Sequence, residues 1–147
     1  MASKSKVYFF FDNVIINLRA RGRLKALVES IFKKEKKKLV NLNYIFCSDQ
    51  ALLKINRDYL QHDFYTDIIT FDLSDSPGNI IGEIYISVDR VKDNAKINDS
   101  SFSSELRRVI FHGALHLCGF DDKTERQKAR MRSREDYYLD VSRETVS

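Results

Sequence analysis

The sequence has few of the residues that mark specialised classes of protein. Its two cysteines can form at most one disulfide bond, which excludes the framework that staples small secreted domains. No apolar run approaches the roughly 20 residues of a membrane-spanning helix. The short apolar segment at residues 7–11 lacks the length and the cleavage site of a signal peptide. With one proline and no internal repeat, we expect a single cytoplasmic domain spanning residues 1–147, with no membrane partner.

The charge balance is only mildly basic. Lys and Arg number 25 against 21 Asp and Glu, which gives a formal charge of +4. Such an excess is compatible with a polyanionic partner but does not establish one, because it also keeps an ordinary protein soluble. Basic side chains cluster at residues 33–38 and 126–134. Each cluster has an alternative interpretation as a solvated end or face of a helix.

The apolar pattern predicts five helices and four strands. The helices are predicted at residues 23–38, 49–56, 88–97, 104–117 and 124–139. The strands are predicted at residues 7–11, 42–47, 67–73 and 80–86. A turn containing Pro77 and Gly78 separates the last two strands, so these should pair as a hairpin. Asp49 is expected to cap the second helix, and Thr124 with Gln127 forms a capping box for the last one.

The helix predicted at residues 104–117 carries the residues most informative about function. It is apolar on nearly all sides and should run through the core. His112 and His116 lie four residues apart, so they share one face of this helix. Gly119 supplies the left-handed residue that ends a helix, and Asp122 follows in the bend. Two imidazoles and a carboxylate form a three-ligand zinc site with an open fourth position, which suits the activation of water.

Other interpretations of this segment exist. Two histidines on a core helix are also compatible with hydrogen-bonded packing residues and no metal. Gly113 stands where metalloproteases of the HExxH kind have a catalytic glutamate, so protease activity is disfavoured, and it gives room for a backbone or substrate to approach the metal. Asp121 is expected to point outward or to support a ligand imidazole. Cys118 would close the site as a fourth ligand, but it faces away from His116 if the helix continues.

Three stretches resemble the YbeY family, bacterial zinc-dependent endoribonucleases of ribosomal RNA maturation. Residues 112–122 are similar to the family pattern H-G-x-L-H-L-x-G-[YF]-D-H. Residues 56–71 resemble N-x-x-Y-R-x-x-D-x-P-T-D-V-L-S-F, and residues 82–87 resemble G-D-I-x-I-S. The three stretches occur in the family's order, and the resemblance covers nearly the whole chain.

The chain departs from the family pattern at two positions. Asp122 stands where the family usually has a third histidine. A carboxylate is a competent zinc ligand, but its charge should raise the pKa of a bound water and alter the metal preference. Leu60 stands where an arginine usually follows the motif tyrosine. If that arginine serves phosphate in relatives, another cation must substitute for it here, and Arg57 and Lys54 are the nearby candidates.

The resemblance implies a fold and a function. The implied fold is an α/β (α+β) domain, in which about five helices pack on a four-stranded mixed sheet and a central buried helix carries the metal ligands. The metal is expected in a cleft lined with positive charge. The implied function is the cleavage of single-stranded RNA in small-subunit ribosomal RNA maturation and ribosome quality control. The expected partners are ribosomal RNA and the small ribosomal subunit or its assembly factors, with no DNA.

We expect one Zn²⁺ per chain, or another divalent metal, held by His112, His116 and Asp122. The metal would polarise a phosphate oxygen, lower the pKa of a bound water toward about 7, or do both. Arg57 is a further candidate for neutralising the phosphate, and His62 for assisting catalysis, although a histidine in a surface loop more often has no role. Two alternatives are a ribosome-associated RNA-binding module with a structural zinc, and a metal hydrolase acting on another phosphate or an amide.

Overall fold

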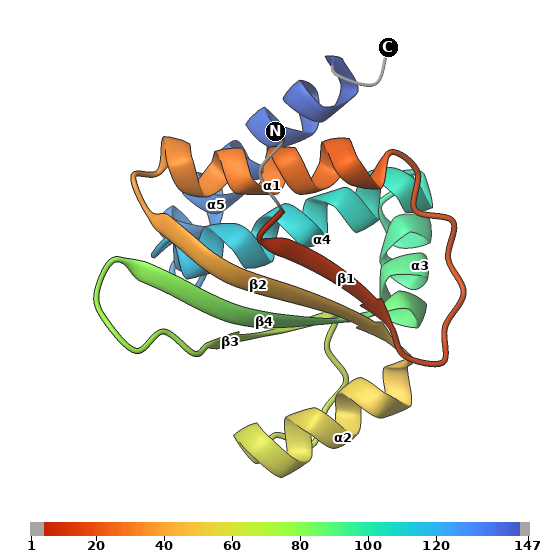
Figure 1. Cartoon of the computed structure of the whole chain (residues 1–147). Helices are drawn as coiled ribbons and strands as arrows, with labels where there is room; N and C mark the ends of the chain where they lie inside the picture. The colour runs from red at the N-terminus through yellow and green to blue at the C-terminus, as the bar shows by residue number, and fades with distance from the viewer. Residues whose placement is uncertain (1–4, 145–147) are drawn as a thin grey trace.

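A four-stranded mixed sheet organises the computed structural model, which describes residues 5–144 (Figure 1). The strands are β1 (Val7–Phe11), β2 (Lys38–Cys47), β3 (Ile68–Asp72) and β4 (Asn79–Ser87). The helices are α1 (Arg21–Lys34), α2 (Asp49–Leu60), α3 (Val88–Ile97), α4 (Phe102–Leu117) and α5 (Glu125–Glu144). This arrangement confirms the predicted α/β fold class. No helix in the described part of the chain has both the length and the apolar character needed to cross a bilayer.

The strands lie in the order β1-β2-β4-β3. β1 pairs parallel with β2, β2 pairs parallel with β4, and β3 pairs antiparallel with β4 as an edge strand. The hairpin predicted from the turn at Pro77 and Gly78 is therefore confirmed. Gly78 has a φ of 84°, a left-handed conformation that favours glycine in such a turn.

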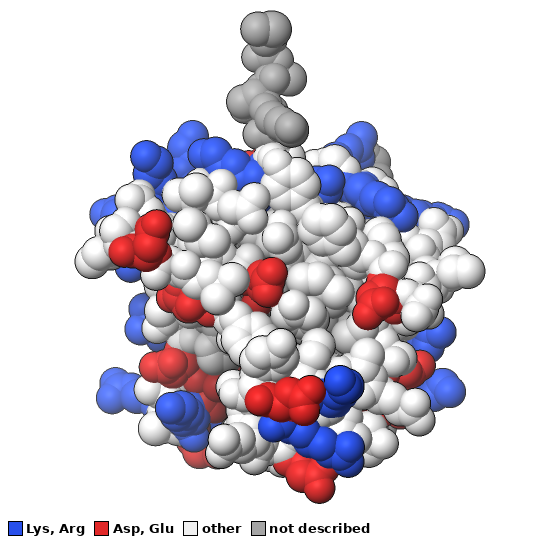
Figure 2. All heavy atoms as spheres, turned by 60° about the horizontal axis from the view of Figure 1, so that its bottom comes forward, with Lys and Arg blue, Asp and Glu red and all other residues white. Residues whose placement is uncertain are grey.

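The two faces of the sheet are covered unequally. α1 and α4 cover one face, α5 packs on α4, and α2 covers only part of the opposite face, next to β3 and β4 (Figure 1). Figure 2 views the molecule from the α2 side and shows a mostly uncharged surface, with Lys and Arg lying mainly along its edges. Phe10 on β1 is 49% exposed on the face that α2 leaves uncovered.

The main core lies between the sheet and α4. Alternate residues of β2 and β4, including Tyr44 and Ile84, are fully buried on this face, as the period of two along a strand requires. α4 is buried on several sides, which confirms the prediction that it runs through the core. At Gly113, a Cβ atom would lie 2.8 Å from Ile84 Cδ1. The room at Gly113 is therefore filled by side chains of the sheet, and the expectation that it admits a substrate is corrected.

Several element boundaries differ from the predictions. α1 ends at Lys34 rather than at residue 38, because Lys36 adopts a left-handed φ of 60° and Lys38 already begins β2. The lysine-rich run looks helical by propensity, but pairing with the sheet extends the strand into it. α5 continues to Glu144, beyond the predicted end at residue 139.

The cap of α2 also differs from the prediction. The N-cap is Ser48, whose hydroxyl accepts a hydrogen bond from the Ala51 N–H at 3.1 Å. Asp49 instead forms an ion pair with Arg90 at 2.7 Å, which ties α2 to α3. The capping box of α5 is confirmed, because the Gln127 N–H donates to Thr124 Oγ1 and Gln127 Oε1 accepts from the Thr124 N–H.

Candidate metal centre

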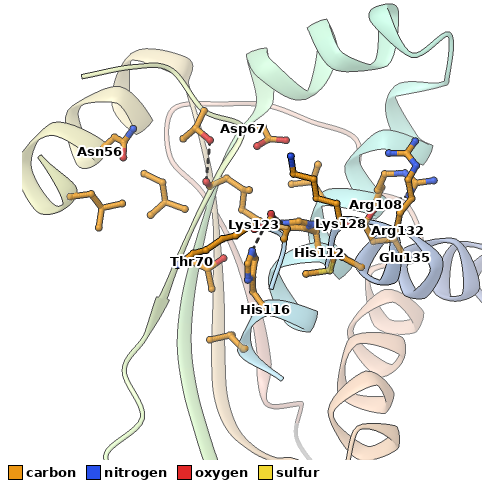
Figure 3. Close-up of a pocket in the computed structure, with 18 of the residues that line it drawn as sticks. Asn56, Asp67, Thr70, Arg108, His112, His116, Lys123, Lys128, Arg132 and Glu135 are labelled. Carbon is orange, nitrogen blue, oxygen red and sulfur yellow. Dashed lines mark hydrogen bonds and ion pairs between the residues drawn. The ribbon is translucent and has the colours of Figure 1, made fainter. Parts of the chain in front are cut away.

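Helix α4 carries both histidines of the candidate site on one face. His112 and His116 are one turn apart, and their ring centroids are separated by 4.7 Å. Most of the remaining surface of α4 is buried in the core, so packing fixes the direction in which the two rings project. Their side chains are 20% and 28% exposed, which leaves both rings open to a cleft (Figure 3).

The bend after α4 brings a carboxylate to the two rings. Gly119 has a φ of 103°, and the Phe120 N–H donates to the Leu115 carbonyl at 3.1 Å, so the helix ends where the sequence predicted. Asp122 Oδ2 then lies 3.3 Å from His112 Nε2 and 3.5 Å from His116 Nε2. The neighbouring Asp121 is exposed, in agreement with an outward orientation.

The three side chains fit a divalent metal ion. One ligand atom from each of His112, His116 and Asp122 lies within 4.8 Å of the others. Two imidazole nitrogens and a carboxylate oxygen are a donor set that zinc accepts, with a fourth position left for water or substrate. In the described part of the chain this is the one group of three or more such residues, and it does not include Cys118. Burial instead raises the pKa of the Cys118 thiol to about 12, which disfavours the thiolate that a metal needs.

Glu135 on α5 fixes the orientation of His112. Its Oε2 lies 2.6 Å from His112 Nδ1, so Nε2 is the ring nitrogen turned toward Asp122. This carboxylate–histidine contact is the usual support for a ligand imidazole. Burial of the His112 ring disfavours the charged form, but the hydrogen bond and charge of Glu135, together with Asp122, outweigh it and raise the pKa of His112.

Arg108 compensates the buried charge of Glu135. Glu135 is 5% exposed, and Arg108 Nη1 donates to its Oε1 at 2.8 Å. Arg108 Nη2 also donates to Asp136 Oδ1 at 2.6 Å. A buried carboxylate without a partner would be strongly destabilising, so the ion pair with Arg108 offsets the cost of burying Glu135 beside His112. Arg108 lies four residues before His112 and reaches Glu135 from the same face of α4.

The candidate ligands lie in a cleft of about 930 Å³ whose two sides differ in character (Figure 3). We call one side the cationic wall; it is formed by α4, the bend and α5, and carries Arg108, Lys123, Lys128 and Arg132. We call the opposite side the aromatic wall; it is formed by the end of α2 and the loop before β3, and carries Leu60, His62 and Phe64. The expected positive charge is therefore confined to one side, and over the whole lining these four basic residues do not outnumber the acidic ones, which are Asp67, Asp72, Glu105, Asp122 and Glu135.

Comparison with known proteins gives the family of this chain. The family model described as Endoribonuclease YbeY matches residues 12–142. The chain belongs to the YbeY family. A relative from Cytophaga hutchinsonii named Endoribonuclease YbeY is 50% identical over 135 residues, covering 92% of this chain and 94% of the relative. One of the same name from Amoebophilus asiaticus is 41% identical over 140 residues, covering 95% of each chain.

A solved structure agrees with the fold. The solution structure of a Thermotoga maritima protein superposes with a TM-score of 0.61 at 27% identity, covering 90% of this chain and 86% of that protein. The similarity therefore extends over most of the fold.

The other residues singled out from the YbeY-like motifs lie in different places. His62 lines the cleft and stacks on Phe64. The described residues that line the cleft do not include Arg57, which is paired with Asp63 at 2.5 Å. Nor do they include Lys54, which forms an exposed pair with Asp58. Leu60, at the position of the family arginine, lines the aromatic wall.

Sequence reasoning missed several residues of the cleft. Lys128 and Arg132 belong to the basic cluster at residues 126–134, but nothing local assigned that cluster to a site. Glu135 and Arg108 had no signal beyond their positions on predicted helices. Their pairing depends on how α5 packs on α4, which the sequence pattern does not specify.

Asp67 is a further acidic residue of the cleft that the sequence did not indicate. It precedes β3, and its backbone carbonyl accepts from the Ser87 N–H at 2.9 Å. Burial raises the pKa of its carboxyl group, although the nearby His112 partly opposes this. Asn94 Nδ2 donates to Asp67 Oδ2 at 3.4 Å. The cleft thus holds a carboxylate with restricted access to water, opposite His112.

Proposed function

We propose that this chain is a metal-dependent, single-strand-specific endoribonuclease, built as one YbeY-like domain over residues 1–147. We further propose that it acts in the cytoplasm on small-subunit ribosomal RNA, in maturation and in ribosome quality control, with the small subunit or its assembly factors as partners. The observation that carries the proposal is the convergence of the His112, His116 and Asp122 donor atoms within 4.8 Å in an open cleft. The name shared by the relatives supports the assignment to RNA.

His112, His116 and Asp122 would hold one Zn²⁺ or another divalent ion. When bound, such an ion would act as a Lewis acid toward a phosphate oxygen and would lower the pKa of a water molecule bound to it. Glu135 holds the His112 ring so that Nε2 faces the cleft, and Arg108 holds Glu135 in place through an ion pair. The buried helix α4 keeps both rings in place before the substrate arrives, which limits the reorganisation needed for reaction.

The cationic wall would bind the RNA backbone. Lys123, Lys128 and Arg132 line the same cleft as His112. Such side chains neutralise phosphates and release counterions, so binding should weaken steeply as salt increases. They supply the charge that the family arginine, replaced by Leu60, does not provide in this chain.

We propose different roles for His62 and Arg57. His62 lies in the cleft lining and is a candidate for assisting proton transfer. Arg57 is held by Asp63, a contact that favours a role in fixing the loop after α2 over a direct contact with phosphate.

A His116→Ala variant tests the proposed function. We expect loss of bound metal and loss of single-turnover cleavage of a single-stranded RNA together, because one of three ligands is removed. Lys54→Ala, which changes an exposed residue of α2, should keep both properties. Full cleavage by metal-free wild-type protein would contradict the proposal. Metal binding by wild type without cleavage at saturating enzyme would instead identify an RNA-binding module with a structural metal.

A further inference from the structure

The proposed hydrolysis does not require the residues of the aromatic wall. We infer that the stacked rings of His62 and Phe64 form a subsite that stacks against one nucleobase of a single RNA strand beside the candidate metal centre. This inference rests on the proposed function and names a part of the cleft that recognises the substrate. Three features support the subsite: the exposure of the two rings, the way their loop is held, and the charge across the cleft.

The two rings are exposed and stacked on each other. The centroids of His62 and Phe64 are 5.1 Å apart, and the ring planes are inclined by only 19°. Phe64 is 55% exposed and Leu60 is 41% exposed, and both line the cleft together with His62. A single exposed apolar residue is ordinary, but a stacked aromatic pair together with an aliphatic residue in the lining of one cleft favours a flat apolar ligand. A nucleobase is such a ligand, and stacking accepts any base.

The loop that carries the rings is held before any ligand binds. α2 ends at Leu60, and its C-cap Gln61 adopts a left-handed φ of 56°. Asn56 is 2% exposed; its Nδ2 donates to the Phe64 carbonyl at 2.9 Å, and its own carbonyl accepts from the His62 N–H at 3.1 Å. Arg57 and Asp63 add an ion pair at 2.5 Å. Because the backbone of both aromatic residues is fixed, stacking would cost little ordering of the loop.

The opposite wall complements this surface. Figure 3 shows Asn56, which holds the aromatic loop, on one side of the cleft, and Arg108, Lys128 and Arg132 on the other, with His112 and His116 between them. A single strand whose phosphates contact the cationic wall can turn its bases toward the aromatic wall. In a duplex the faces of the bases are already stacked, so this subsite would also favour single-stranded RNA.

The chain contains no tryptophan, so Phe64→Trp provides a single fluorescent reporter at the proposed subsite. Phe10→Trp is the matched control, because Phe10 is 49% exposed and lies on β1, at the opposite edge of the sheet from β3. We expect a short single-stranded RNA, added with a chelator so that it stays intact, to quench the indole fluorescence only in the Phe64→Trp variant. A strand of the same length with abasic sugars, which keeps the phosphates, should not quench it.

Equal quenching in the two tryptophan variants, or equal quenching by the abasic strand, would overturn the inference. The same holds if the Phe64→Trp variant cleaves RNA normally and shows no quenching. A wild-type protein that fails to cleave RNA contradicts the proposed function, whereas base-dependent quenching would still support the subsite. The two failures are therefore distinguishable.

A second measurement compares the RNA-binding affinities of Phe64 variants. Phe64→Ala should weaken binding of the normal strand by roughly 5- to 100-fold, the usual effect of removing one base–aromatic stack. Binding of the abasic strand and metal content should stay unchanged, because Phe64 carries no charge that could bind phosphate and is not one of the candidate ligands. Phe64→Tyr, which keeps a ring, should restore binding of the normal strand. Equal weakening for both strands would show a general effect on the cleft and refute stacking.

Discussion

The two walls of the cleft are built by different means. The cationic wall belongs to α4 and α5, where a buried helix, the Arg108–Glu135 ion pair and the capped start of α5 hold the side chains. The aromatic wall belongs to a short loop, where Asn56 and the Arg57–Asp63 pair hold the backbone and the rings stay exposed. Under the proposed function the two walls divide the work: the first would hold the RNA phosphates beside the candidate metal centre, and the second would contact the base.

The largest effect on metal content and RNA cleavage should come from a change at Asp122, in the bend that completes the candidate metal centre. Asp122→Ala removes one of three ligand atoms, so we expect loss of stoichiometric metal and a fall in cleavage of about 100-fold or more, because the water-activating ion is lost. Asp122→His, which restores the usual family residue, should retain both. Metal analysis beside single-turnover cleavage measures this. Normal metal content in Asp122→Ala would show that the carboxylate is not a ligand.

The next largest effect should be on metal affinity, and it tests the contact of Glu135 with His112. Glu135→Gln should reduce metal affinity by roughly 10- to 100-fold, because the imidazole loses its charged partner. Asp136→Asn is the matched control, since Asp136 also contacts Arg108 but is largely exposed and does not touch His112. A competitive titration with a metal indicator gives both affinities. Equal losses in the two variants would assign the effect to Arg108 rather than to the imidazole.

A smaller effect should separate the charge of the cationic wall from the stacking of the aromatic wall. Lys128→Ala and Arg132→Ala should each weaken RNA binding a few-fold and reduce the slope of log affinity against log salt by about 0.7, the value for one phosphate contact to a single strand. Lys54→Ala, outside the cleft lining, should leave the slope unchanged. Unchanged slopes for both cleft variants would place the RNA backbone elsewhere.

The smallest effect concerns Asp67. Because burial raises the pKa of its carboxyl group, the folded protein binds that proton more tightly than the unfolded chain does, and the charged form destabilises the fold. Asp67→Asn should therefore raise the Tm of the metal-free protein at neutral pH. The gain should shrink as the pH falls through the folded pKa and disappear below the ordinary value of 3.8. Thermal unfolding at several pH values measures this, with Asp75→Asn in the exposed turn as a control. A constant gain would exclude ionisation as the cause.

Local patterns predicted the element types well. Strands and helices were identified in the correct order because apolar periodicity and capping residues act within a few residues of each other. The errors lie where tertiary contacts compete with local preference. The lysine run leaves the helix, and its last residue, Lys38, begins β2 because it pairs with Asn79 on β4. Asp49 leaves the cap of α2 to Ser48 because Arg90 is within reach.

The metal candidates were visible in the sequence because every step that joins them is local. One helical turn separates His112 from His116, and a left-handed glycine returns the chain to Asp122. The sequence did not indicate that Glu135 contacts His112, or that the cations of α5 and the aromatic loop line the same cleft. The packing of α5 and α2 around α4 and the sheet decided these positions. These contacts join residues far apart in the chain, and such pairs meet only when burial of a shared core brings their elements together.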